Sequence, residues 1–435
     1  MNFTSSLPYD PRAVIAQIQR RHEKGRATFD TLTLNGILLF FIGLTVVGSG
    51  FRAARPEIGG LLLQPYLVPI LLAMPYILLS RLQELPTRVL LGLGLFTLSF
   101  VMTSLGPASL AIMLKLVVSV LTTATIALLV RSRADLIAGA TGLLLAVAAL
   151  ALHGLEEPDL AGLGVKAIEV ANKNSYSMYA LPALLLAGYL VLRIKPKSKV
   201  LLTLSVVCSL AVLVAIFMSG NRSGYLGAVL VALLLVRERK IAGVLLVGMV
   251  VAAIAYYLIN HGSTEILERR VNQTVEGNSS DTLRINLLKA CVKIGLANPI
   301  AGVSPGNLPD EIRHNMATGH VEEVIVGPHN VFGLIIGGNG LLCTGCLLLL
   351  AWSLWTWPPS ARRGGSTSEF IEARKLLRYM LVLWAVRGMF NDEILYNPGF
   401  CIGLGLAMGM CVAASKLQPL AVVGAGARPQ LAPTS

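Results

Sequence analysis

The sequence predicts an all-α polytopic membrane protein with about 12 transmembrane helices, and its composition and apolar runs carry that prediction. Hydrophobic residues make up 54% of the 435 residues and charged residues only 14%, and the mean hydropathy is +0.70. Soluble domains carry about 25% charged residues, whereas each helical crossing of a bilayer core needs about 20 predominantly apolar residues. The chain can therefore supply about a dozen crossings in one membrane domain.

The expected spans are apolar runs separated by polar connections. They cover residues 31–50, 61–80, 88–106, 109–130, 136–152, 176–192, 200–218, 220–236, 241–259, 330–356, 373–390 and 397–415. Residues 1–30 then form a cytoplasmic N-terminal segment, and residues 31–415 form the transmembrane domain. Residues 416–435, rich in Ala, Gly and Pro, are predicted to be a disordered cytoplasmic tail.

The distribution of Lys and Arg predicts the orientation. Of these residues, 23 lie in the connections and span ends on the side of the termini, whereas the short connections on the other side hold six. Cytoplasmic connections carry the excess of basic residues, so both termini are expected in the cytoplasm. Topology also accounts for the net charge of +13, and no nucleic-acid partner is expected.

One connection, residues 261–328, is long enough to form a periplasmic loop of 68 residues. Within it, residues 281–297 have apolar positions at helical spacing, opened by a Ser-Ser-Asp cap and closed at Asn298-Pro299. We expect an amphipathic helix that lies against the outer membrane face, with Arg284 in its first turn.

Three helix starts on the predicted periplasmic side carry the candidate chemistry. Arg222 opens a span, Arg284 lies near the start of the loop helix, and His329 stands at the start of the tenth span. Unpaired backbone N–H groups and the positive helix dipole attract anions at such ends. Guanidinium groups add planar, bidentate contacts to phosphate, so the three starts together predict a phosphate site.

His329 is the candidate general base of this site. Positive helix ends and nearby arginines disfavour imidazolium, and a neutral imidazole can accept a proton. Asn330 could orient either partner. Each residue alone also has a simpler interpretation, because interfacial histidines often serve as polar caps and arginines often contact lipid headgroups. Their shared side of the membrane is what favours the site.

Four further residues are supporting or weaker candidates. Arg387, Asp392 and Glu393 lie close together near the outer end of the eleventh span, where a local ion pair is the alternative. Lys115 lies inside the fourth span and either faces a cavity or extends to the interface.

The acidic pairs in the loop lack histidines at metal-ligand spacing, so neither a metal site nor a cofactor is predicted.

The motifs around these residues resemble the bacterial O-antigen ligase family, within the group that includes O-antigen polymerases. They are SGNRSGYLG around Arg222, LRINLLKACVKIGLANPIAGVSPGN with Arg284, and HNVFGLIIGGNG from His329. Asp392 matches an acidic residue that follows the eleventh span in the family. The resemblance covers most of the chain by topology, and its specific part runs from about Ser219 to Gly340.

The resemblance implies an inner-membrane enzyme that transfers a glycan from undecaprenyl diphosphate to the lipid A core at the periplasmic face. His329 would deprotonate the acceptor hydroxyl, which attacks the anomeric carbon with inversion. Arg222 and Arg284 would hold the diphosphate and stabilise its growing charge without a metal. Membrane lipids would surround the protein.

Three alternatives remain open at the level of sequence. An O-antigen polymerase and a protein O-oligosaccharyltransferase would use the same donor chemistry with other acceptors. A transporter of polyprenyl-linked sugars would instead place ionisable groups near the bilayer midplane on broken helices in matching halves. The sequence shows no internal repeat, and its candidates cluster at the outer ends of the spans.

Overall fold

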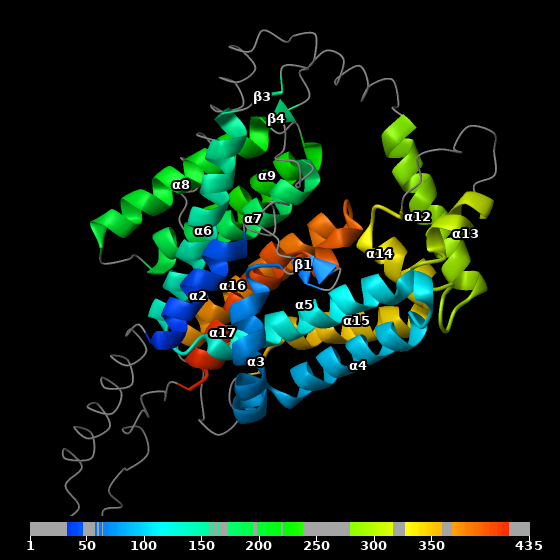
Figure 1. Ribbon diagram of the computed structural model, residues 1–435, viewed down its shortest axis with the longest axis horizontal. Helices are drawn as coiled ribbons and strands as arrows, with labels where there is room; N and C mark the ends of the chain where they lie inside the picture. Colours follow the sequence, from blue (N-terminus) through cyan, green and yellow to red (C-terminus); the bar gives the residue numbers. More distant parts are fainter. Residues whose placement is uncertain are drawn as a thin grey trace, which may run out of the picture.

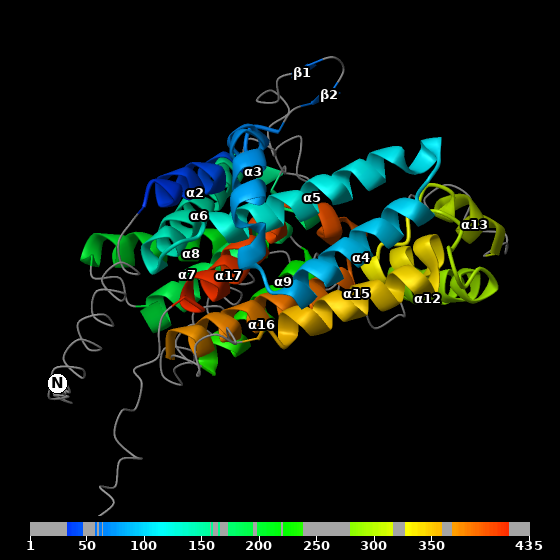
Figure 2. The ribbon, with the colours of Figure 1, turned by 90° about the horizontal axis from the view of Figure 1, so that it is seen from below.

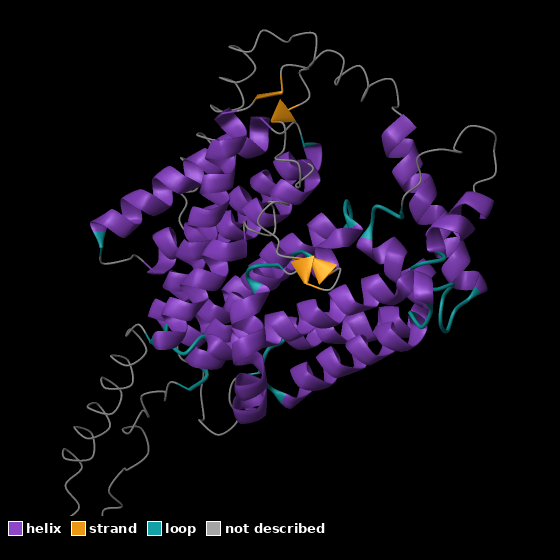
Figure 3. Ribbon diagram, in the orientation of Figure 1, coloured by secondary structure: helices purple, strands orange, loops and turns teal. Residues whose placement is uncertain are grey.

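Apolar runs in the sequence form helices throughout the described part of the chain (Figures 1 and 3). The structure is a computed structural model that describes residues 33–46, 57–58, 61–62, 64–156, 158–159, 164–165, 173–194, 198–218, 221–237, 279–315, 327–358 and 368–416. The N-terminal segment 1–30, the expected span 241–259, most of the C-terminal tail and much of the expected loop lie outside these ranges.

Helices account for almost all of the described structure. The long ones are α2 (Leu34–Thr45), α3 (Leu67–Arg81), α4 (Thr87–Thr103), α5 (Leu110–Leu129), α6 (Arg133–Glu156), α7 (Lys173–Tyr189), α8 (Lys199–Met218), α9 (Arg222–Val236), α12 (Ser279–Ala297), α15 (Gly340–Trp355), α16 (Ser368–Gly388) and α17 (Pro398–Ala414). The short ones are η3 (Leu82–Glu84), η4 (Pro107–Ser109), η5 (Leu190–Ile194), α13 (Leu308–Asn315), α14 (Val331–Gly333), η6 (Leu334–Asn339) and η8 (Asp392–Tyr396). Two-residue strands form two antiparallel pairs, β1 (Glu57–Ile58) with β2 (Leu61–Leu62) and β3 (Pro158–Asp159) with β4 (Gly164–Val165).

Six helical runs among the described residues are long and apolar enough to cross a bilayer. They are Leu67–Glu84, Leu110–Leu129, Arg133–Leu152, Tyr176–Arg193, Lys199–Ile216 and Val331–Trp355. Four shorter apolar helices accompany them: Leu34–Thr45, Thr87–Thr103, Ser223–Val236 and Pro398–Ala414. The chain is therefore a helical membrane protein, and twelve crossings remain a prediction.

Helix α17 is buried on almost all sides. Every residue from Pro398 to Ala414 except Leu404 is buried, and the helix packs against α5, α6, α7 and α16. Helices α4, α5 and α15 extend together toward α12 and α13, whereas α6, α7 and α8 lie at the opposite end of the molecule (Figure 2). An apolar helix buried on all sides is the expected core of such a bundle.

Helix α12 differs from the expected surface helix in two respects. It begins at Ser279, so the Ser-Ser pair lies inside the helix and Arg284 falls in the second turn. Its buried residues Leu287, Cys291 and Ile294 pack against η6. The predicted end at Asn298 is confirmed. The predicted apolar face of α12 exists, but it packs against η6 at the start of the tenth span and not against the membrane face.

Candidate active site

The C-terminal end of α16 joins elements that are far apart in the sequence. Arg387, the penultimate residue of α16, is fully buried and donates from Nη2 to the Ser177 Oγ of α7 over 2.9 Å. The Asn221 side-chain amide also donates to Ser177 Oγ, over 2.9 Å. Asn221 is the N-cap of α9, because its Oδ1 accepts from the Ser223 N–H. The helix start that carries Arg222 is therefore fixed next to Arg387.

Arg284 approaches the same place from α12. Its side chain is exposed, and its charge acts directly on the Arg387 guanidinium. Packing of α12 against η6 sets this position: a Cβ on Gly295 would lie 2.5 Å from the Ile336 carbonyl oxygen, so the two backbones touch. Two cations that act on each other electrostatically create a local attraction for an anion.

The turn before α14 carries His329 and Asn330. Asn330 is the N-cap of α14, and its Oδ1 accepts from the N–H groups of Phe332 at 2.8 Å and Gly333 at 3.1 Å. Its Nδ2 donates to the Met389 carbonyl at 3.2 Å, directly after the end of α16. His329 is exposed and holds a left-handed backbone conformation with φ of 50°. Asn330 therefore orients the turn that presents the imidazole.

Asp392 and Glu393, which open η8, are the charged neighbours of His329. Both carboxyl groups interact electrostatically with the histidine, and the Asp392 Oδ2 lies 3.4 Å from where a Gly327 Cβ would stand. Burial raises the pKa of Asp392 above its usual range, and the nearby His329 partly opposes that shift. Burial and the Asp392 charge likewise raise the pKa of Glu393. The interactions that the structure gives His329 are thus with acids, where the sequence had suggested arginines.

Lys115 and Tyr396 extend this cluster toward α5. The Lys115 Nζ lies 5.5 Å from the centroid of the Tyr396 ring, within the range of a cation–π contact. Its charge also acts on Glu393. Lys115 is exposed and lies beside the candidate site, while its position in a cavity or at the interface stays a prediction.

An apolar cavity lies next to η8, and residues of α4, α5, α15, α16 and α17 line the rest of it. Ile394 and Leu395 of η8 line it together with Phe96, Trp384 and Phe400. It begins one residue after Glu393, so a ligand with a polar head and an apolar tail could contact both the charged cluster and the cavity.

The structure brings together most of the predicted site residues. His329, Asn330, Arg387, Asp392 and Arg284 all lie around the end of α16, while Arg222 is placed by its helix start and its side chain lies outside the described part. Ser177 and Tyr396 were missed, because a serine and a tyrosine in apolar helical sequence carry no recognisable motif. Among the described residues, no three His, Cys, Asp or Glu side chains are grouped to hold a metal ion.

One comparison with known proteins identifies a family. Residues 204–350 match a family model described as O-antigen ligase. The matched segment runs from α8 to α15 and contains Arg222, Arg284 and His329, whereas Arg387 and Asp392 lie beyond it. A search of curated proteins found no match.

Proposed function

Because residues 204–350 carry the O-antigen ligase family domain, we propose that this membrane protein transfers an O-antigen glycan from undecaprenyl diphosphate to the lipid A core. The reaction takes place at the periplasmic face of the bacterial inner membrane. One observation carries the proposal: guanidinium groups and a histidine–carboxylate cluster meet at the end of α16.

The cationic side of the site suits the donor. Arg222 and Arg284 bind the diphosphate, and Arg387 supports them from its buried position next to the α9 start. Guanidinium groups match phosphate oxygens in shape and charge. The apolar cavity next to η8 supports a donor with a polyprenyl chain, since its lining is almost entirely apolar.

The acidic side of the site suits proton transfer. His329 removes the proton of the acceptor hydroxyl while that oxygen bonds to the anomeric carbon. The bond from this carbon to the diphosphate oxygen breaks, and its electron pair leaves with the diphosphate, which inverts the configuration. Asp392 stabilises the imidazolium as it forms, as carboxylates do beside catalytic histidines.

The first experiment supplies purified protein with lipid-linked glycan and one of three acceptors: lipid A core, a second lipid-linked glycan or an acceptor protein. Transfer to lipid A core supports the ligase, whereas elongation of the second glycan identifies a polymerase and glycosylation of the protein identifies an O-oligosaccharyltransferase. Movement of the donor across vesicles without transfer would indicate the transporter.

Variants then test the assigned roles. We expect His329→Ala to lower the transfer rate by about 10²–10⁴-fold while donor binding persists, the usual contribution of a general base. Arg284→Ala should weaken donor binding by roughly tenfold or more, because it removes charge-assisted hydrogen bonds. Lys289→Ala, an exposed cation on the same helix, is the matched control.

Wild-type transfer by His329→Ala would remove the proposed base. Transfer that is lost with a chelator and restored by a divalent ion would contradict the metal-independent mechanism.

A further inference from the structure

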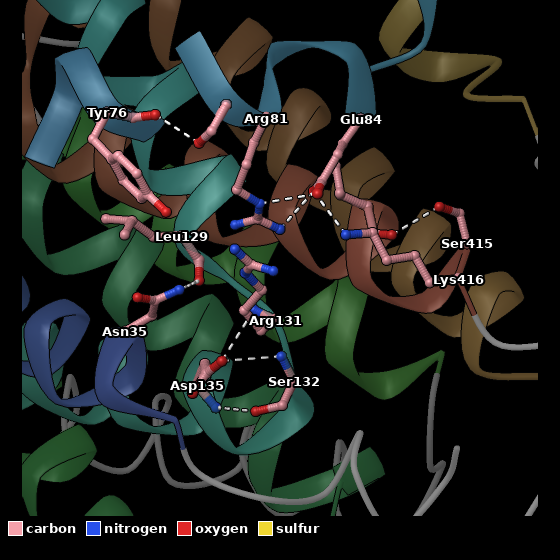
Figure 4. Close-up of polar contacts among 12 residues, drawn as sticks. Asn35, Tyr76, Arg81, Glu84, Leu129, Arg131, Ser132, Asp135, Ser415 and Lys416 are labelled. Carbon is pink, nitrogen blue, oxygen red and sulfur yellow. Dashed lines mark hydrogen bonds and ion pairs between the residues drawn. The ribbon is translucent and has the colours of Figure 1, made fainter. Parts of the chain in front are cut away.

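A second charged cluster lies far from the candidate active site, where η3, the α5–α6 connection and the end of α17 meet (Figure 4). Glu84 accepts from Arg81 Nε at 3.0 Å and Nη2 at 2.5 Å. The same carboxylate pairs with Lys416 Nζ at 2.7 Å. The Arg131 side chain lies beside them. We call Arg81, Glu84, Arg131 and Lys416 the Arg131 cluster; it holds three cations and one anion.

Asp135, the other nearby acid, is occupied by backbone and hydroxyl groups. Its carboxylate accepts from the Thr33 N–H at 2.9 Å and from the N–H groups of Arg131 and Ser132 at 3.0 Å each. It therefore caps the start of α6 and secures the start of α2. The pKa of Arg131 lies below its usual range because of partial burial and then the Arg81 charge. Glu84 already pairs with Arg81 and Lys416, so the positive charge of the Arg131 cluster is not fully balanced.

Arg81 contributes a buried donor that lacks an acceptor. Its side chain is almost fully buried, and Nη1 has no hydrogen-bond partner among the described residues. Such a donor costs free energy unless an acceptor reaches it. Figure 4 shows the Arg131 guanidinium next to that of Arg81. An anion with several oxygens could bridge the two groups, and phosphate has the matching geometry.

The neighbouring surface of α3 is largely apolar and exposed in the structure. Leu72, Tyr76 and Leu79 are 79%, 73% and 90% exposed, and they lie on one helix face because their spacing is four and three residues. Tyr76 also interacts with Arg131, so this face leads directly to the Arg131 cluster. Acyl chains along α3 would place a headgroup at Arg131.

We propose that Arg131 and Arg81 bind the phosphate group of an anionic phospholipid whose acyl chains lie along α3. The exposed side chains of Tyr76 and Arg131 rotate to admit a phosphate oxygen to Arg81 Nη1, while Lys416 adds positive charge at the rim. The positive-inside distribution of the sequence assigns this lipid to the inner leaflet, where anionic headgroups attract basic residues.

The test uses the full-length protein in a neutral detergent. Thermal unfolding is followed while phosphatidylglycerol, diacylglycerol with the same chains or inorganic phosphate is titrated, which gives an apparent dissociation constant for each. We expect phosphatidylglycerol to stabilise the protein. Arg131→Gln should weaken this binding by roughly tenfold, the effect of losing a charge-assisted contact, while Arg131→Lys should retain most of it.

Lys199→Gln is the matched control, because Lys199 is an exposed cation on the same predicted side of the membrane; its affinity should equal that of the wild type. Equal lipid affinity in the wild type and Arg131→Gln would overturn the proposal. So would equal stabilisation by diacylglycerol, which lacks the phosphate. If millimolar inorganic phosphate displaces the lipid, the site binds free phosphate and the lipid assignment fails.

Discussion

At the residue scale, Ser177 shows how a small side chain can organise a charged site. Its hydroxyl oxygen accepts from both Arg387 and Asn221, so the end of α16 and the start of α9 are fixed to one atom. Buried guanidinium groups require such acceptors, since desolvated donors are costly. The positions of Arg387 and of the Arg222 backbone thus depend on a residue that carries no charge.

Asp392 predicts a pH dependence of stability. Because burial raises its pKa in the folded protein, the folded state binds more protons than the unfolded state between the usual aspartate pKa of about 3.9 and the raised value. Stability contributed by this group is therefore greatest below that window and falls as the pH rises through it. We therefore expect the thermal unfolding midpoint of Asp392→Asn to fall less steeply with rising pH in this window than that of the wild type.

Glu393 has a pKa raised in the same direction, so Asp392→Asn should reduce the pH dependence without removing it. The double variant with Glu393→Gln should reduce it further. Identical pH profiles for the wild type and Asp392→Asn would show that Asp392 titrates normally in the folded protein.

At the scale of elements, η6 explains the glycines of the tenth span. The Val303 and Ser304 N–H groups donate to the Gly337 and Gly338 carbonyls, at 3.1 and 2.8 Å. A π-helical segment can leave such carbonyls open to outside donors. Gly338 lets the turn before α13 approach, because its Cβ would lie 3.1 Å from Pro305 Cα. The segment thereby fixes α12, with Arg284, relative to His329.

Gly340 gives a sharp test of this arrangement. Its φ is +77°, and a Cβ there would lie 2.7 Å from the Gly302 nitrogen and the Ile300 oxygen. We expect Gly340→Ala to destabilise the protein by at least about 1–3 kcal/mol, the usual cost of such backbone strain, as measured by a lower thermal unfolding midpoint.

Gly345→Ala is the control within the same helix, because nothing lies within 4 Å of its Cβ position. It should be neutral or stabilising by up to about 1 kcal/mol, as expected when alanine replaces a helical glycine. Equal effects of the two substitutions would contradict the close packing assigned to the junction of η6 and α15.

The elements that the sequence predicted well are those with a local signal. Apolar runs located the helices, and the Asn298-Pro299 stop located the end of α12. His329, Arg284 and Asp392 could be named as candidates because their chemistry is unusual beside apolar spans, and their roles stay predictions. The π-helical break at η6, the partner of the α12 apolar face and the contacts of Ser177 depend on segments distant in the sequence, so no local pattern could predict them.

At the scale of the whole molecule, α17 separates the two charged regions. It begins directly after η8 at the candidate active site and ends just before Lys416 of the Arg131 cluster. Its 17 residues span about 25 Å at 1.5 Å per residue, close to the thickness of a bilayer core. The two regions therefore suit opposite faces of the membrane.

Orientation can be tested with single added cysteines. We expect His314→Cys, on the exposed surface of α13, to react with a membrane-impermeant maleimide in intact spheroplasts, and Lys199→Cys to react only after permeabilisation. Five of the six native cysteines are buried and Cys346 is partly buried, so the unmodified protein is the background control. Labelling of Lys199→Cys in intact spheroplasts would contradict the predicted topology and indicate the opposite orientation.

The left-handed backbone of His329 has an evolutionary consequence. Glycine would hold φ of 50° without strain, whereas other residues lose about 1–3 kcal/mol there. If the imidazole is needed for transfer, selection for stability favours glycine at position 329, whereas selection for activity favours histidine. A lineage that stopped using the reaction would drift toward glycine at 329 and gain a sturdier fold as it lost the enzyme.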